Sequence, residues 1–402
     1  MQQSSFEQIV VGIQEHVRQR SSEQPEPLPQ PLRIMCFDGG PSGPASLELL
    51  RRLEQDEKTK GLLAKTSLFC GTSNGALIAL SLSKALQEGK SALQAIDVAL
   101  GFQWETLDAF RPSPREWVRF VAGIAPLSGR KLSSLIERHF GERMELDDLT
   151  TRPVSVVSFN MKTQQINSFM SHGPHASKNT PISKAALAAS ALPFLLPIRR
   201  GDGAAGRGWF RPALGDWLID GGVANNNPTF TGVSDALLCC AKGGEDYFWT
   251  ARRYTPYLRV LSFGARPMSW TAGSDGSEPI TWGWLRHLRA KTPHNFVDVL
   301  IGGASAADQR IAQMLLGVHR YHRVECEMET WKMASIISRW LVKLKRVREM
   351  YEKLADQEWN KQLELRKTQS ERQRRDKDYN NVIDWVSEFW NEDWADLHRT
   401  SW

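Results

Sequence analysis

Long hydrophobic runs are missing from this sequence of 402 residues, and none approaches the length that crosses a bilayer as a helix. The first residues include Glu7 and Glu15 and contain no apolar segment of the signal-peptide type, so no secretory signal is expected. Only five cysteines occur, an odd number without paired spacing, which favours a reducing compartment. Together these features predict a cytoplasmic protein.

Zinc-finger spacing, a P-loop and an RNA-binding signature are also absent. The chain has 51 Lys and Arg residues against 45 Asp and Glu residues, a formal net charge of +6. A positive charge favours anionic partners, either a membrane surface or nucleic acid. Because no nucleic-acid motif accompanies it, no nucleic acid is expected as a partner. Neither a cofactor nor a metal is expected.

The central part of the sequence alternates between strands and helices. Short apolar runs at 32–37 and 67–70 predict strands, and each is followed by a glycine-containing turn and a helix. The stretches "RPVSVVSFNM" and "YLRVLSFG" predict further strands. Such alternation indicates an α/β fold, with a mostly parallel central sheet sandwiched by helices, that ends near residue 325. Cys36 and Cys70 end the first two runs and are expected to be buried.

The two ends of the chain differ from this centre. Residues 1–31 combine an amphipathic helix with a proline-rich connector. Residues 326–402 predict a charged, Trp-rich helical extension, in which a basic helix precedes a mostly apolar stripe formed by Val382, Val386, Phe389, Trp390, Asp393 and Leu397. Acidic side chains on the last helix favour packing against the central domain, a second copy of the chain or a partner protein. The basic helix leaves contact with a membrane surface open.

The stretch "GTSNG", Gly71 to Gly75, matches G-x-S-x-G and lies between a predicted strand and a predicted helix. A sharp turn there lifts the Ser73 hydroxyl out of the backbone at the N-terminus of the helix. A developing oxyanion at this place meets free N–H groups, such as that of Asn74, and a favourable dipole. Ser73 is therefore a candidate nucleophile.

The stretch "LIDGGVANNNP", Leu218 to Pro228, places Asp220 at the end of an apolar run. Gly221 and Gly222 follow directly, and a tight turn of this kind is easily accepted by glycine. Taken alone, the pattern favours a helix cap or a turn former at Asp220.

The stretch "CFDGGPSGP", Cys36 to Pro44, places Asp38 and two glycines between a strand and a helix, where successive N–H groups can surround an anion. The motifs "DGGPSGP", "GTSNG" and "DGGVANNNP", in this order, resemble those of the patatin-like phospholipase family. "AALAASALPFLLP" and "LLGVHRYHRV" resemble two further elements of that family. The resemblance covers roughly residues 32–325.

The resemblance implies a lipid acyl hydrolase of the phospholipase A type, peripheral at membranes, whose substrate is the phospholipid surface itself. Ester bonds of glycerophospholipids would be cleaved by a Ser–Asp dyad through an acyl-enzyme, with Ser73 as nucleophile and Asp220 as base. The two turns would be shaped by four glycines: Gly71, Gly75, Gly221 and Gly222. A carboxylate near its reference pKa of about 4 is a weak base, so Asp220 must act through direct contact.

Within hydrolases, the alternative is a catalytic triad of serine, acid and a later histidine, in the chain order of the α/β-hydrolases. His319 and His322 come late enough in the chain, but both lie among arginines in a segment that predicts a strand. This setting favours a structural or solvated role for both histidines.

The glycine loop departs from the family pattern Asp-Gly-Gly-Gly-x-Arg-Gly. Pro41 replaces the third glycine, Gly43 the arginine and Pro44 the last glycine. Proline has no N–H, and losing one oxyanion donor can cost about 100- to 1,000-fold in rate. We expect the oxyanion hole to persist with shifted donors, Gly39 and Gly40 above all, among the set Gly39, Gly40, Ser42, Gly43 and Asn74. The alternative is a weakened or inactive module that binds lipid or a protein partner in a signalling or defence complex.

The stretch "RRGDGAAGRGWFRP", residues 199–212, is rich in glycine and arginine. It predicts a mobile flap, from which Trp209 and Phe210 could enter lipid while arginines meet phosphate. An ordinary solvated loop is the alternative. The C-terminal helices could also join the chain to a second copy or to a protein partner.

Overall fold

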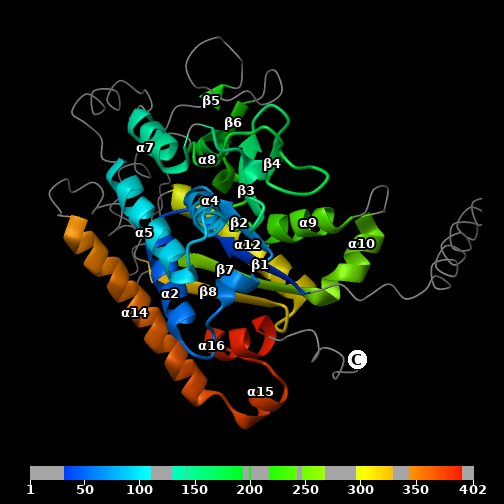
Figure 1. Cartoon of the computed structure of the whole chain (residues 1–402). Helices are drawn as coiled ribbons and strands as arrows, with labels where there is room; N and C mark the ends of the chain where they lie inside the picture. The colour runs from blue at the N-terminus through cyan, green and yellow to red at the C-terminus, as the bar shows by residue number, and fades with distance from the viewer. Residues whose placement is uncertain are drawn as a thin grey trace, which may run out of the picture. The chain divides into compact units, whose positions relative to one another are not determined.

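The computed structural model describes residues 31–109, 129–141, 143–192, 199–200, 217–241, 247–267, 296–328 and 344–391 (Figure 1). Residues Leu32–Trp402 form one compact unit and Met1–Pro31 another. Three of the sequence predictions lie outside the described residues: the helix within 1–31, the flap side chains Trp209 and Phe210, and the end of the last stripe at Leu397.

An eight-stranded sheet forms the centre of the larger unit, with the order β5-β6-β3-β2-β1-β7-β8 and with β4 paired to β3. The strands are β1 (Leu32–Phe37), β2 (Leu68–Thr72), β3 (Val154–Asn160), β4 (Gln165–Met170), β5 (Arg199–Arg200), β6 (Trp217–Asp220), β7 (Leu258–Pro267) and β8 (Tyr321–Met328). The pairs among β3, β2, β1, β7 and β8 are parallel, whereas β4 and β6 pair antiparallel with β3 and β5 pairs antiparallel with β6. The predicted mostly parallel sheet is confirmed.

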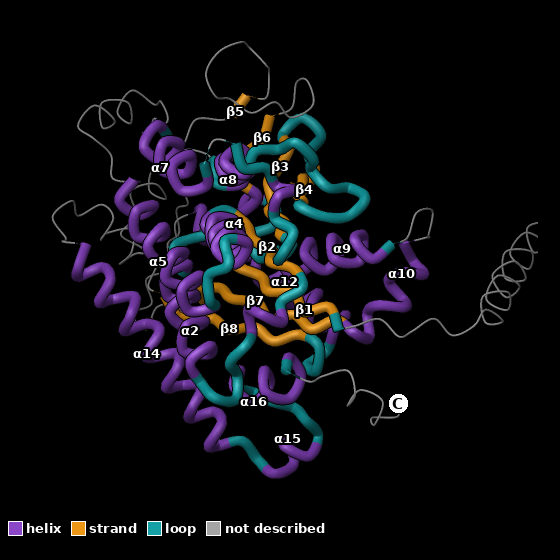
Figure 2. The backbone as a smooth tube through the Cα atoms, viewed as in Figure 1, coloured by secondary structure: helices purple, strands orange, loops and turns teal. Residues whose placement is uncertain are grey.

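Helices cover both faces of this sheet (Figure 2). The α-helices of the described residues are α2 (Gly43–Gln55), α3 (Leu62–Lys65), α4 (Asn74–Gln87), α5 (Ala92–Ala109), α7 (Arg130–Phe140), α8 (Ile182–Ala189), α9 (Thr229–Cys240), α10 (Tyr247–Tyr254), α12 (Phe296–Leu316), α14 (Leu344–Thr368), α15 (Glu371–Arg375) and α16 (Val382–Trp385). Single turns of 3-10 helix are η1 (Leu146–Asp148), η2 (Gly221–Val223) and η3 (Thr255–Tyr257), and η4 (Val386–Trp390) is a π-helical turn.

Side chains of β1 alternate between the two faces. Met35 and Phe37 belong to the core formed with α2, α4 and α5, whereas Ile34 and Cys36 belong to the core formed with α9 and α12. This follows from the two-residue period of a strand. Because helices cover both faces of the sheet, β1 and β2 consist largely of apolar residues. The predicted burial of Cys36 and Cys70 is confirmed.

The C-terminal helices pack against the sheet domain. α14 runs along α2 and β8, and α16 contacts β8 and α14. Trp385 and Trp390 are fully buried, and their indole N–H groups donate to the carbonyl oxygens of Val318 and Leu62. The described part of the apolar stripe therefore completes the core on the α2 side.

Among the helices in the described ranges, none is both long enough and apolar enough to span a membrane.

Candidate active site

Three strands pair with β3, and their registers bring the C-terminal ends of two of them together. β4 pairs along residues 155–160 of β3, so β2, which pairs with 154–157, and β6, which pairs with 158–160, both lie on the opposite edge. β2 and β6 therefore meet end to end beside β3, with Thr72 opposite Val157 and Asp220 opposite Ser158. The residue after β2 is Ser73, which is thereby placed next to Asp220.

Ser73 occupies a strained turn between β2 and α4. Its backbone has φ 54° and ψ −121°, a left-handed conformation that side-chain-bearing residues rarely adopt. The turn is tight because two glycines permit close backbone packing. A Cβ on Gly71 would lie 2.2 Å from the Gly75 carbonyl oxygen, and one on Gly75 would lie 2.1 Å from that of Phe37. Both positions therefore require glycine.

Ser73 and Asp220 are in direct contact. The Ser73 hydroxyl donates to Asp220 Oδ2 at 2.5 Å, and the Gly222 N–H donates to Asp220 Oδ1 at 2.7 Å. A Cβ on Gly221 would lie 2.5 Å from the Val157 carbonyl oxygen, so this turn also needs glycine. The carboxylate is thus held from both sides, with one oxygen on the serine.

Asp220 is fully buried, and burial has a chemical consequence. Desolvation raises the pKa of its carboxyl from 3.8 to about 6, against the lowering effect of the hydrogen bonds from Ser73 and Gly222. This differs from the sequence expectation of an ordinary carboxylate near 4. A base with a pKa of about 6 approaches the basicity of histidine, whose reference pKa is about 6.5.

Three contacts fix the glycine loop. The Gly39 N–H donates to the Asn226 carbonyl oxygen at 3.1 Å, so the donor expected first from the sequence is already bonded. The Gly40 carbonyl accepts from the Asn74 amide at 3.1 Å. The Pro41 carbonyl accepts from the Tyr351 hydroxyl of α14 at 2.7 Å.

Other predicted donors remain available. Gly40 has φ +100° and, among the described residues, no acceptor is recorded for its N–H. Asn74 and Gly75 begin α4, where the geometry of a helix leaves the first N–H groups unpaired. Ser42 is the buried N-cap of α2, and Gly43 is its first residue.

Gly43, which stands where the family pattern has arginine, is closely surrounded by side chains of α4 and α5. A Cβ at this position would lie 2.5 Å from Asn74 Nδ2 and 2.7 Å from Gln103 Oε1. The side chains of α4 and α5 therefore fill the space that a larger residue at 43 would need. Pro44 is the second residue of α2, a place where its missing N–H costs no helical hydrogen bond.

An ion pair lies beneath the loop. The Asp38 carboxylate accepts from both terminal nitrogens of Arg323 on β8, at 3.0 and 2.5 Å, and both side chains are almost fully buried. Ser305 of α12 donates to Asp38 at 3.4 Å and accepts from the Asn226 amide at 2.9 Å. This network joins the glycine loop to the loop that follows Asp220.

The two late histidines lie elsewhere. The His322 ring packs at a tilt against Trp385, with ring centres 5.4 Å apart, and His319 is in edge contact with Phe389 at 5.2 Å. Burial lowers the pKa of His322 to about 4, so its imidazole is neutral at pH 7. The recorded side-chain partner of Ser73 is the carboxylate Asp220, and both histidines pack against aromatic rings of the C-terminal segment.

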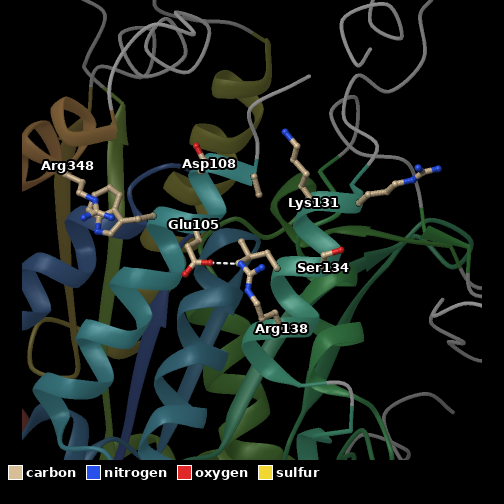
Figure 3. Close-up of a pocket in the computed structure, with 10 residues that line it drawn as sticks. Glu105, Asp108, Lys131, Ser134, Arg138 and Arg348 are labelled. Atoms are coloured by element: carbon tan, nitrogen blue, oxygen red, sulfur yellow. Dashed lines mark hydrogen bonds and ion pairs between the residues drawn. The ribbon is translucent and has the colours of Figure 1, made fainter. Parts of the chain in front are cut away.

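A pocket of about 600 Å³ opens between α5, α7 and α14 (Figure 3). Arg138 and Glu105 pair across it at 2.7 Å, and the Arg348 guanidinium lies 5.4 Å from the ring centre of Trp104. The pocket contains neither Ser73 nor Asp220, but Trp104 also contacts Tyr351, which holds the glycine loop.

Several known proteins are similar to this chain. Residues 35–231 match the model of the family described as patatin-like phospholipase. Patatin-like protein 1 of Oryza sativa subsp. indica is 25% identical over 309 residues, which are 72% of this chain and 72% of that protein. A cGAMP-activated phospholipase of Vibrio cholerae is 30% identical over 229 residues, 53% of this chain and 59% of that protein. The crystal structure of VipD from Legionella pneumophila aligns with 90% of this chain and 80% of that one, at 12% identity and a TM-score of 0.31.

The chain contains a domain of the patatin-like phospholipase family at residues 35–231, which confirms the resemblance of its three motifs. All three lie within the matched residues, whereas β8 and α14, which supply Arg323 and Tyr351, lie beyond them.

Proposed function

We propose that the protein is a lipid acyl hydrolase of the phospholipase A type, which cleaves ester bonds of glycerophospholipids at a membrane surface. The observation that carries the proposal is the 2.5 Å contact between the Ser73 hydroxyl and the buried Asp220 carboxylate. Membership of the phospholipase family supports the substrate class. The Vibrio cholerae relative is itself named a phospholipase.

Acylation begins when Ser73 Oγ attacks the ester carbonyl carbon and transfers its proton to Asp220 Oδ2. The raised pKa of Asp220, about 6, favours this transfer because it brings the base closer to working pH. The tetrahedral intermediate then expels the lysophospholipid alkoxide, which takes the proton back from Asp220. The acyl group remains on Ser73.

Deacylation repeats these steps with water. Asp220 accepts a proton from the attacking water, the second tetrahedral intermediate collapses, and Ser73 Oγ leaves with that proton. The products are a free fatty acid and the original enzyme. One carboxylate serves as base and acid in both halves, so the reaction needs no histidine.

The oxyanion of each intermediate would be stabilised by backbone N–H groups around Ser73. Asn74 and Gly75 at the start of α4 supply donors together with the helix dipole. Gly40, whose N–H has no recorded acceptor in the described part of the chain, is the donor we assign in the glycine loop. Pro41 supplies no N–H, so the oxyanion hole has fewer donors, but it still functions with these groups.

The test is release of free fatty acid from mixed glycerophospholipid vesicles by the wild type and by Ser73→Ala, Asp220→Ala and Pro41→Gly. Ser387→Ala, at an exposed serine, serves as the matched control. We expect release by the wild type and the control, and loss of at least about 1,000-fold in the first two variants.

Release that survives Ser73→Ala would overturn the proposal. A silent wild type with an active Pro41→Gly variant would mean that the glycine loop has disabled the enzyme. Silence of all variants would favour the non-catalytic module that binds lipid or a protein partner.

A further inference from the structure

Tyr351 reaches the glycine loop from a part of the chain beyond the family match. Its hydroxyl donates to the Pro41 carbonyl oxygen at 2.7 Å across 310 residues of sequence. The side chain is fully buried, and its ring lies 5.5 Å from that of Trp104. Two other contacts of the loop, with Asn226 and Asn74, come from within residues 35–231, whereas Arg323, which pairs with Asp38, lies beyond them as Tyr351 does.

Proline at position 41 makes the orientation of its neighbours more important. Because Pro41 has no N–H, the donors next to it in the loop are the N–H groups of Gly40 and Ser42. The Ser42 N–H belongs to the 41–42 peptide group, whose carbonyl Tyr351 holds, and the Gly40 N–H belongs to the 39–40 peptide group, which is separated from it by the 40–41 group. A rotation of either plane would turn a donor away from the site.

The geometry of one peptide group then connects Tyr351 to a donor. In a trans peptide, the C=O of Pro41 and the N–H of Ser42 point in opposite directions. The described residues contain no cis peptide bond. The hydrogen bond from Tyr351 therefore draws the Pro41 carbonyl toward α14 and directs the Ser42 N–H away from that helix.

We propose that Tyr351 is a positioning residue for ester hydrolysis, which fixes the 41–42 peptide group and with it the N–H groups of the glycine loop. The inference rests on the proposed function of Ser73. It makes α14 a part of the active site although the helix contributes no group that touches substrate. The competing explanation is that the hydroxyl only satisfies a buried carbonyl and leaves the reaction unaffected.

Tyr351→Phe separates these explanations, because it keeps the ring against Trp104 and removes only the hydroxyl. Arg348→Ala is the matched control. Arg348 lies one turn earlier on α14 and contacts the same Trp104 ring, 5.4 Å from its centre, and no contact with the glycine loop is recorded for it among the described residues.

Two readouts are needed, and both are compared with the wild type. With a soluble p-nitrophenyl ester, we expect Tyr351→Phe to lower kcat about tenfold with KM unchanged, while Arg348→Ala keeps both constants. In hydrogen exchange, amides of the segment 39–43 should exchange about tenfold faster in Tyr351→Phe and at the wild-type rate in Arg348→Ala.

Wild-type kcat in Tyr351→Phe, or an equal loss in Arg348→Ala, would overturn the inference. Unchanged exchange of the segment 39–43 would also overturn it, whatever the activity. Failure of the proposed function has a different signature, which is hydrolysis that survives Ser73→Ala. In that case faster exchange in Tyr351→Phe would still establish that Tyr351 holds the loop.

Discussion

The Asp38 carboxylate accepts two hydrogen bonds from the guanidinium of Arg323, a residue 285 positions further along the chain. Asp38 opens the glycine loop directly after β1, and Arg323 lies on β8, with β7 between the two strands. Because both side chains are almost fully buried, the Asp38 charge depends on Arg323 for its compensation, while Arg323 also pairs with Glu325 at 2.7 Å. The ion pair ties β8, the strand at one edge of the described sheet, to the loop beside Ser73.

Removing one member of this pair should destabilise the protein strongly. We expect Arg323→Met to lower the free energy of unfolding by about 3–5 kcal/mol, because it leaves the Asp38 charge buried without a partner. The double variant with Asp38→Leu should lose less than the sum of the two single losses. Urea unfolding measures all three. Lys367→Ala, at an exposed pair with Glu364, is the control and should change the value by less than about 0.5 kcal/mol.

The buried Asp220 should set the acid limb of the pH profile. Because its pKa is about 6 and the base must be ionised, kcat/KM should fall tenfold per pH unit below about pH 6. Burial also raises the pKa of Asp308, to about 7, and that carboxyl contacts Asn225 in the loop after Asp220. Asp308→Asn should therefore leave the limb near pH 6 in place. A limb near pH 4 would contradict the assignment of Asp220.

The same carboxylate should cost stability at neutral pH. A pKa raised from 3.8 to about 6 means that the folded state loses stability as the pH rises through this interval and remains less stable above it. Asp220→Asn should therefore raise the free energy of unfolding at pH 8 by up to about 3 kcal/mol, with little gain at pH 4. Denaturant unfolding at the two pH values tests this. An equal gain at both would assign the effect to something other than ionisation.

Gly75 should tolerate no side chain. An alanine Cβ there would lie 2.1 Å from the Phe37 carbonyl oxygen and 2.6 Å from that of Asp38, and backbone atoms cannot move aside cheaply. We expect Gly75→Ala to lose more than about 3 kcal/mol of stability or to fail to fold. Gly101→Ala on α5 meets nothing within 4 Å and should instead add about 0.5–1 kcal/mol. Thermal unfolding of the two variants distinguishes these outcomes.

Local patterns made much of the fold and the dyad predictable. Apolar runs indicated β1, β2, β3 and β7, because strands covered on both faces need continuous hydrophobic sequence. The turn around Ser73 was predictable because a glycine on either side permits its close packing. The resemblance of the ordered motifs to the family predicted that Ser73 and Asp220 act together. The register of β2 and β6 along β3 explains their contact in space.

Long-range pairings could not be predicted in the same way. The sequence contains no signal that the Gly39 N–H is bonded to Asn226, since that bond depends on where the loop after β6 lies. Nor does it indicate that Tyr351 reaches Pro41, because the pattern of α14 fixes only its apolar face. Arg323 stands within "HRYHRV", a stretch noted for its resemblance to the family, and its burial against Asp38 follows only from the β7–β8 pairing.

The burial of Trp385 and Trp390 sets a lower limit on the length of polypeptide that can be produced as an intact protein. A product stopped at the end of β8 would expose the parts of α3 and β8 that these indoles contact and would leave the carbonyl oxygens of Val318 and Leu62 without their donors. Such a fragment would be prone to aggregate, and its inactivity would say nothing about Ser73. Any shortened form for crystallisation or assay should therefore extend past Trp390.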